Sequence, residues 1–203
     1  MSLFNKHNFQ IADFCAKESS RAELNGIFIE PQRTTATDSF TLISVSTPTG
    51  FKIDNYPSMP NKPTPKENFK PFILPAEDGK ALTKLLSRKV SVPILENAVI
   101  LRSDNETAEI GATDLQSFQS ITPKIIQGEF PKFNDILVER GSFIEISVNP
   151  AYLVKIGQFF SKFLIDKTLK IKIPKEVDRP IFFYGKTEKQ SVVAVLMPVK
   201  SSE

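Results

Sequence analysis

Apolar positions along this chain switch between the spacing of a helix and the spacing of strands, and the switch recurs. After a helix cap at Asn5 or Asn8, apolar residues recur every three or four positions up to Cys15, which predicts an amphipathic helix. β-Branched and aromatic residues then fill 22–31 and 40–47, which predicts strands. The first stretch is therefore a helix followed by strands.

A second stretch follows the same plan after an interruption. Residues 54–68 hold four prolines and no apolar periodicity, so they are predicted to form a connector and neither a helix interior nor a central strand. A short strand is predicted at 69–75 and a helix at 76–89. The apolar face of this helix comprises Ala81, Leu82, Leu85 and Leu86. Three strands follow at 96–103, 106–113 and 116–123.

The third stretch has the clearest helix start. A strand at 142–148 leads to Asn149 as the N-cap and Pro150 at the first helical position. The side chains expected to face inward are Leu153, Ile156, Phe160 and Phe163. Strands are predicted at 169–174, 179–185 and 191–200.

The order β-α-β-β-β thus recurs loosely in the three stretches, with only residues 1–4 available for a first strand in the first stretch. It predicts an α+β protein built from repeated modules. We assign module 1 to residues 1–53, the connector to 54–68, module 2 to 69–138 and module 3 to 139–203.

Composition offers little for catalysis. One histidine, His7, and one cysteine, Cys15, cannot form a zinc cluster or an internal disulfide, and Cys15 has no evident base partner. Eight glycines form no phosphate-binding loop. No apolar run approaches the roughly 20 residues of a membrane span, and the N-terminus lacks a signal peptide. The sequence predicts a cytoplasmic binding protein, without membrane, cofactor, metal or enzymatic activity.

Basic residues recur on the polar side of each predicted helix. They are Lys80, Lys84 and Arg88 in the second helix, Lys155 and Lys162 in the third, and Lys6 and Lys17 in the first. In the first helix Asp13 shares the stripe and dilutes its charge. A solvated lysine face would explain any single helix equally well. Three such helices in one chain favour a surface that faces a polyanion, although the net charge is only +3.

Five motifs together resemble one known family, the bacterial DNA sliding clamp, which is the beta subunit of the replicative DNA polymerase. The motifs are "SSRAELNGIFIE…TTATDSFTL" (19–42), "VPILENAVILRSDNETAEIGATDL" (92–115), "GEFPKFNDIL" (128–137), "VNPAYLVKI" (148–156) and "VVAVLMPVK" (192–200). The first motif resembles the family's middle domain, the second resembles the opening of its first domain, the third resembles a stretch that leads out of a domain, and the last two are similar to its last domain. The chain departs from the family pattern at Ser39-Phe40-Thr41, where clamps have Gly-x-Arg, and at Val199-Lys200, where they have Met-Arg.

The resemblance also explains why Ala-Thr-Asp occurs twice, at 36–38 and 112–114. In clamp modules the Thr-Asp pair ends one strand and begins the next. We therefore expect Asp38 and Asp114 to accept backbone hydrogen bonds in a turn, as Asp commonly does. A metal-binding or catalytic role is not expected, because no second carboxylate sits at ligand spacing.

The clamp resemblance implies a ring that encircles double-stranded DNA without sequence specificity and tethers a DNA polymerase and a clamp loader through short peptide motifs. The implied DNA-facing residues are Lys6, Lys17, Lys80, Lys84, Arg88, Lys155 and Lys162. The implied partner-peptide pocket comprises Leu24, Thr37, Ser39, Phe40, Leu42, Val195 and Met197. Leu24 and Val195 fit a plain sheet core equally well.

Clamps of this superfamily close with twelve modules, so three modules per chain imply a homo-tetramer. The rival is a dimer with a smaller or open ring. An alternative function is a clamp-like protein-interaction module that keeps the fold and the pocket and does not encircle DNA.

Overall fold

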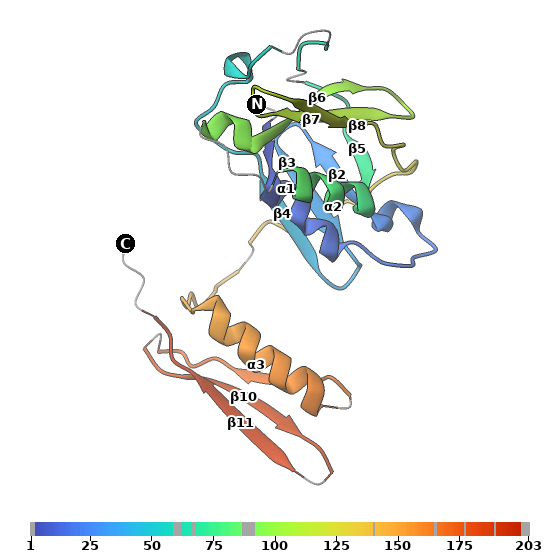
Figure 1. Ribbon diagram of the computed structural model, residues 1–203. Helices are drawn as coiled ribbons and strands as arrows, with labels where there is room; N and C mark the ends of the chain where they lie inside the picture. Colours follow the sequence, from blue (N-terminus) through green and yellow to red (C-terminus); the bar gives the residue numbers. More distant parts are fainter. Residues whose placement is uncertain are drawn as a thin grey trace. The chain divides into compact units, whose positions relative to one another are not determined.

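The computed structural model of the protein describes residues 3–58, 62–65, 68–86, 92–139, 141–164, 166–176, 178–188 and 190–199. The chain divides into two compact units, Met1–Phe133 (unit 1) and Asn134–Glu203 (unit 2) (Figure 1). Unit 1 combines two α-helices with two antiparallel sheets, and the described part of unit 2 combines one α-helix with one antiparallel sheet, so the predicted α+β class is confirmed. The module boundaries at 53, 68 and 138 stay a prediction.

Unit 1 contains two successive runs of the same elements. The first run is β1 (Leu3–Asn5), α1 (Lys6–Gln10), β2 (Gly26–Glu30), β3 (Arg33–Thr37) and β4 (Leu42–Ser46). The second run is β5 (Phe72–Pro75), α2 (Ala76–Leu85), β6 (Asn97–Ser103), β7 (Ala108–Thr113) and β8 (Phe118–Ile121). Short 3-10 turns at Ile11–Phe14, Ala22–Asn25, Ile53–Asn55 and Pro93–Glu96 join some of these elements.

The two runs exchange their first strands. The sheets have the orders β4-β3-β2-β5 and β1-β6-β7-β8, so each contains one strand from the other run. Phe4 of β1 lies opposite Ala98 of β6, and Leu74 of β5 lies opposite Ile27 of β2. Because backbone hydrogen bonds cross between the runs twice, neither sheet is complete without both.

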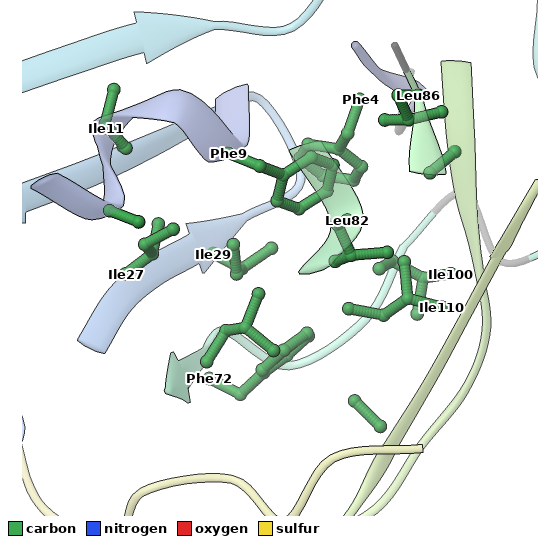
Figure 2. Packing of buried hydrophobic residues seen from close by; sticks show 14 of the residues in the cluster. Phe4, Phe9, Ile11, Ile27, Ile29, Phe72, Leu82, Leu86, Ile100 and Ile110 are labelled. Atoms are coloured by element: carbon green, nitrogen blue, oxygen red, sulfur yellow. The ribbon is translucent and has the colours of Figure 1, made fainter. Parts of the chain in front are cut away.

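One apolar core joins the exchanged sheets. Helices α1 and α2 contact each other. Figure 2 shows Phe9 and Leu82 of these helices in one cluster with Ile29 of the first sheet and Ile100 of the second. Each fully buried side chain of this size contributes about 1.5–3 kcal/mol of burial free energy. The core is therefore shared by the two runs and stabilises the exchange.

The outer face of each sheet is also covered by the chain that follows the other sheet's last strand. After β4, Ile53 and Tyr56 pack on the β6 side against Val99 and Leu101. The Tyr56 hydroxyl donates a hydrogen bond to the Asn97 carbonyl at 3.0 Å. After β8, two phenylalanines pack on the first sheet, and Phe28 stacks on one of them with centroids 4.9 Å apart. These phenylalanines are Phe130 and Phe133.

The first helix is shorter than its apolar spacing indicates. Asn5 caps α1 in a capping box with Asn8, as one of the two predicted caps. The helix ends at Gln10, continues as a 3-10 turn to Phe14, and becomes extended at Cys15. Ile11, Ala12 and Cys15 are buried in the core, whereas 39% of Phe14 is exposed. The predicted stripe from Lys6 to Lys17 is therefore wrong, because Lys17 lies beyond the helix.

Unit 2 is a single run of the same kind. It contains α3 (Pro150–Phe163), β9 (Lys170–Lys172), β10 (Ile181–Lys186) and β11 (Ser191–Leu196), with sheet order β11-β10-β9. Asn149 accepts a hydrogen bond from the Ala151 N–H at 2.9 Å, and Pro150 is the first helical residue, so the predicted helix start is confirmed. Phe160 is buried among Leu164, Ile181, Phe183 and Leu196.

Two expectations for unit 2 are wrong. Leu153 does not face inward, since 42% of it is exposed and the sheet packs closer to the C-terminal half of α3. Residues 142–148 form no strand in the described structure, although the Ser147 carbonyl accepts a hydrogen bond from the Val199 N–H at 2.9 Å. A strand needs a partner along its length, and this segment has one bond where β5 has a ladder.

The exchange makes a prediction about stability. Phe4→Ala removes a fully buried side chain from β1 and should lower the free energy of unfolding by about 3–5 kcal/mol. Phe40→Ala makes the same chemical change at a side chain that is 95% exposed and should leave stability within about 0.5 kcal/mol of the wild type. Urea unfolding followed by circular dichroism measures both. Equal stabilities for the two variants would contradict an integral β1.

Candidate functional site

The first Thr-Asp pair forms a turn held by both of its side chains. The backbone N–H groups of Phe40 and Thr41 donate to Asp38 Oδ1 at 2.9 and 2.7 Å. Thr37 Oγ1 donates to the Thr41 carbonyl at 2.6 Å and accepts from the Ser39 N–H at 3.1 Å. Ser39 takes a left-handed backbone conformation with φ 77°. The turn therefore fixes the connection from β3 to β4.

The second pair repeats this geometry between β7 and β8. Gln116 and Ser117 donate their N–H groups to Asp114 Oδ1 at 3.0 and 2.6 Å, and Leu115 has φ 73°. Thr113 Oγ1 donates to the Ser117 carbonyl at 2.9 Å. The expectation that both aspartates accept backbone hydrogen bonds in a turn is confirmed.

These hydrogen bonds also explain the acidity of the two carboxyls. The backbone N–H of Thr41 lowers the pKa of Asp38, and the backbone N–H of Ser117 lowers the pKa of Asp114. Both groups are therefore held as carboxylates by their own turns. Over the described residues no three His, Cys, Asp or Glu side chains are grouped to hold a metal ion.

The other chemically reactive candidates have ordinary settings. Burial raises the pKa of the Cys15 thiol to about 12, so the thiol stays protonated and is a poor nucleophile. His7 is exposed, with Nδ1 2.8 Å from Oε1 of Gln10 on the same helical turn.

The predicted pocket residues of unit 1 have different environments. Leu24 is buried in the 3-10 turn before β2, and Leu42 packs partly buried beside Phe130 and Phe133. Thr37 and Ser39 belong to the turn described above. Phe40 sits at the tip of that turn with its ring in solvent. Phe40 is thus the member of this set that is free to contact a partner.

The remaining pocket candidates belong to unit 2. Val195 lies on β11 and Met197 follows that strand, and about half of each is exposed. The predicted residues thus fall in two units, and their assembly into one pocket stays a prediction. Exposed Val195 does not behave as a plain sheet core, whereas buried Leu24 does.

Sequence reasoning missed a small pocket beside the second Thr-Asp turn. It is lined by Leu85, Leu86, Leu95, Ala112, Thr113, Asp114, Ser117 and Gln119. The end of α2 closes it on one side and the β7–β8 turn on the other. The repeated Ala-Thr-Asp marked the turn, and the pocket itself depends on the end of α2 and on Leu95, which are distant in sequence.

The candidate DNA-facing lysines of unit 1 lie mainly on its two helices. Lys6 is the first residue of α1, and Lys80 and Lys84 project from α2 one turn apart. Lys80 Nζ lies 3.0 Å from Asp13 Oδ1, so the carboxylate offsets part of the positive charge of this lysine. Lys17 is exposed outside any helix, and Arg88 lies outside the described residues. The positive charge of this surface is therefore weaker than the stripe alone implies.

Helix α3 carries an undiluted positive face. Lys155 and Lys162 are exposed and separated by two helical turns, and α3 has no acidic residue. Gln158 lies between them on the same side. This arrangement suits repeated contacts with phosphates and provides no group for catalysis.

Within the described part of the chain, no helix has the length and apolarity to cross a membrane. No protein-family model matches the sequence, and no curated protein matches it.

Solved structures, in contrast, match nearly the whole chain. The DNA polymerase sliding clamp of Bacillus subtilis gives a TM-score of 0.64 at 16% identity, over 95% of this chain and 46% of that chain. The beta sliding clamp of C. crescentus gives 0.62 at 15% identity, over 100% and 51%. The Proliferating Cellular Nuclear Antigen of Entamoeba histolytica gives 0.58 at 13% identity, over 95% and 69%.

The fold implied by the five sequence motifs is thereby confirmed. The chain spans about half the length of the bacterial clamps that it matches. At these identities the likeness concerns the arrangement of helices and strands, and the protein has the fold of the DNA sliding clamps.

Proposed function

We propose that the protein is a DNA sliding clamp, a non-enzymatic processivity factor that encircles duplex DNA and tethers a DNA polymerase and other replication proteins. The observation that carries the proposal is the clamp fold over nearly the whole chain. The lysine-bearing helices α2 and α3 support it, because a clamp needs positive charge on helices and no base-reading groups. The proposed function includes a cytoplasmic location, where a bacterial-type clamp would meet DNA.

In this proposal the helices contact phosphates, and the closed ring retains the DNA. Lys6, Lys17, Lys80, Lys84, Arg88, Lys155 and Lys162 remain the proposed DNA-facing set. Lysine ammonium groups neutralise phosphates without distinguishing bases, so binding has no sequence specificity. Each contact is weak, and processivity follows from topology. Lys155 and Lys162 are the strongest members, because no acidic residue shares their helix.

We further propose that partner peptides, including those of the polymerase and clamp loader, bind at the first Thr-Asp turn together with the end of β11. The exposed ring of Phe40 and the exposed thioether of Met197 support this surface. Aromatic and methionine side chains are typical anchors at protein interfaces.

The alternative is a clamp-like interaction module that does not encircle DNA. The diluted charge around Lys80 is the observation that favours it. Retention on a circular duplex, compared with the same duplex after linearisation, separates the two functions. A ring slides off free ends and stays on the circle, whereas a module without a ring shows no such difference.

The charge on α3 generates the first functional prediction. Lys155→Glu with Lys162→Glu should weaken binding to a short duplex and lower the slope of log affinity against log salt by about 2, because each phosphate contact contributes roughly 0.9. Fluorescence anisotropy at several salt concentrations measures the slope.

The matched control is Lys124→Glu with Lys132→Glu, which changes the net charge equally at exposed positions outside the helices. The control should keep most of the wild-type slope. Equal losses in the two double variants would mean that total charge matters and that α3 does not face DNA.

The proposed peptide pocket generates the second functional prediction. Phe40→Ala with Met197→Ala should weaken binding of a polymerase-derived peptide by about 1–3 kcal/mol, the usual range for anchor side chains. Gln116→Ala serves as the control, because Gln116 occupies the position of Phe40 in the equivalent turn. Calorimetry that finds the same affinity for the double variant and the control would move the peptide site elsewhere.

Ring closure generates the third functional prediction. Three modules per chain and twelve per ring predict an assembly of four chains, with closed symmetry that leaves no strand edge free. Native mass spectrometry at micromolar concentration and moderate salt should show this species. A dominant dimer would rule out the tetramer and favour a smaller or open ring.

A further inference from the structure

Unit 2 repeats half of the architecture that unit 1 shows complete. In unit 1 the first strand of the second run, β5, is bonded along both edges. On one edge Ile73 lies opposite Phe28 of β2, and on the other the Ile126 N–H donates to the Ile73 carbonyl at 2.9 Å. Ile126 follows β8, the last strand of the same run.

The corresponding segment of unit 2 makes a hydrogen bond like the one between Ile126 and Ile73. The Val199 N–H, just after β11, donates to the Ser147 carbonyl at 2.9 Å. Ser147 stands three residues before the first residue of α3, as Ile73 stands three before the first residue of α2. Residues 146–149 therefore occupy the place of β5. The edge that β5 gives to β2 meets no strand in the described part of unit 2.

Strand β9 has a matching open edge. The sheet order β11-β10-β9 leaves β9 outermost, whereas its counterparts β2 and β6 each pair with the first strand of the other run. Ile171 on β9 is 49% exposed and Ile173 just after it is 54% exposed. Ile29, at the position of Ile171 in unit 1, is fully buried. Unit 2 thus presents two unsatisfied strand edges and uncovered apolar side chains beside them.

We propose that unit 2 pairs with unit 2 of a second copy of this chain by reciprocal strand exchange. Residues 144–149 of each copy add to β9 of the other, and the two α3 helices lie together as α1 and α2 do in unit 1. Both missing strands are supplied by one partner, because the two open edges belong to the same unit. A two-fold interface of this kind is self-complementary.

The register of this pairing follows from unit 1. There the residue just before the second helix, Pro75, lies opposite Gly26 of β2. Phe28 of β2 lies opposite Thr35 of β3, and extending this register by two residues aligns Gly26 with Thr37, the last residue of β3. In unit 2 Lys170 of β9 lies opposite Tyr184 of β10, and extending this register by two residues aligns Thr168 with Lys186, the last residue of β10. Asn149 of one copy therefore lies opposite Thr168 of the other.

This register joins chemically matched side chains. On the helix side of the sheet, Ile146 meets Ile171 and Ile144 meets Ile173. The contact removes Ile144, Ile171 and Ile173 from water, each of which is about half exposed. On the other side, Glu145 meets Lys172, an opposite-charge pair. A register shifted by one residue would place charged side chains on the apolar face.

Helix α3 is also prepared for a neighbour. Leu153 is 42% exposed and occupies the position of Gly79 in α2. A Cβ on Gly79 would lie 2.6 Å from Ile27 Cδ1 of the other run, so this position faces the partner in unit 1. Leu153 would then contact the second copy, with the two units spaced more widely than the two runs of unit 1, because unit 1 has no room for a Cβ at this position.

The strand pairing is argued from the two units alone. Only the number of chains in a closed ring rests on the proposed function. Reciprocal pairing at unit 2 joins chains two by two, and the proposed ring of four chains would contain two such pairs. The pairing itself is tested without DNA, so its failure and the failure of the clamp proposal are distinguishable.

A disulfide across the interface tests the register. The full-length chain with Ile144→Cys and Ile173→Cys should form covalent dimers under mild oxidation, because directly opposed strand residues bring their Cβ atoms within disulfide reach. The control, Ile144→Cys with Lys172→Cys, is shifted by one residue and places the thiols on opposite faces of the sheet. Its yield should be at least roughly tenfold lower. The native Cys15 is buried and does not interfere.

A charge exchange gives an independent readout. Glu145→Lys should weaken self-association roughly threefold to tenfold, and adding Lys172→Glu should restore it, because the pair is reversed and still opposite in charge. Analytical ultracentrifugation measures both. Covalent dimers from the matched pair with restoration by the double variant support the proposal. A monomer by native mass spectrometry, equal cross-linking of both cysteine pairs, or no restoration overturns it.

Discussion

The exchange of first strands between the two runs of unit 1 is the constraint on which the rest of that unit depends. Backbone hydrogen bonds carry β1 into the sheet of β6 and β5 into the sheet of β2. Because each of these strands leads directly into a helix, the exchange places α1 against α2. The surfaces that bear the candidate lysines and the Thr-Asp turns are consequences of this arrangement.

Local chemistry made part of the fold predictable. The Asn149 cap, Pro150 and the two Thr-Asp turns depend on contacts within a few residues, and all of them have the predicted roles. The exchange could not be predicted, because an apolar strand pattern does not state which sheet the strand joins. The early end of α1 has the same origin, since the shared core decides which residues turn inward.

The candidate site was predictable to a similar extent. Helical spacing placed Lys84, Lys155 and Lys162 correctly on exposed helix faces. It could not show that Asp13 reaches Lys80, because the contact crosses between two helices that are far apart in the sequence. It also could not show that Leu42 is covered by Phe130 and Phe133, which arrive from the end of the other run.

The exchange also has a consequence for the order of folding during synthesis. Residues 3–5 find their strand partner at 97–99, so the first run cannot finish its core until most of the second has left the ribosome. During that interval β2 lacks β5, and Phe4 and Phe9 lack part of their cover. Contacts so distant in sequence slow folding and prolong the exposure of strand edges. The nascent chain therefore exposes apolar side chains and unpaired strand edges until its second run emerges.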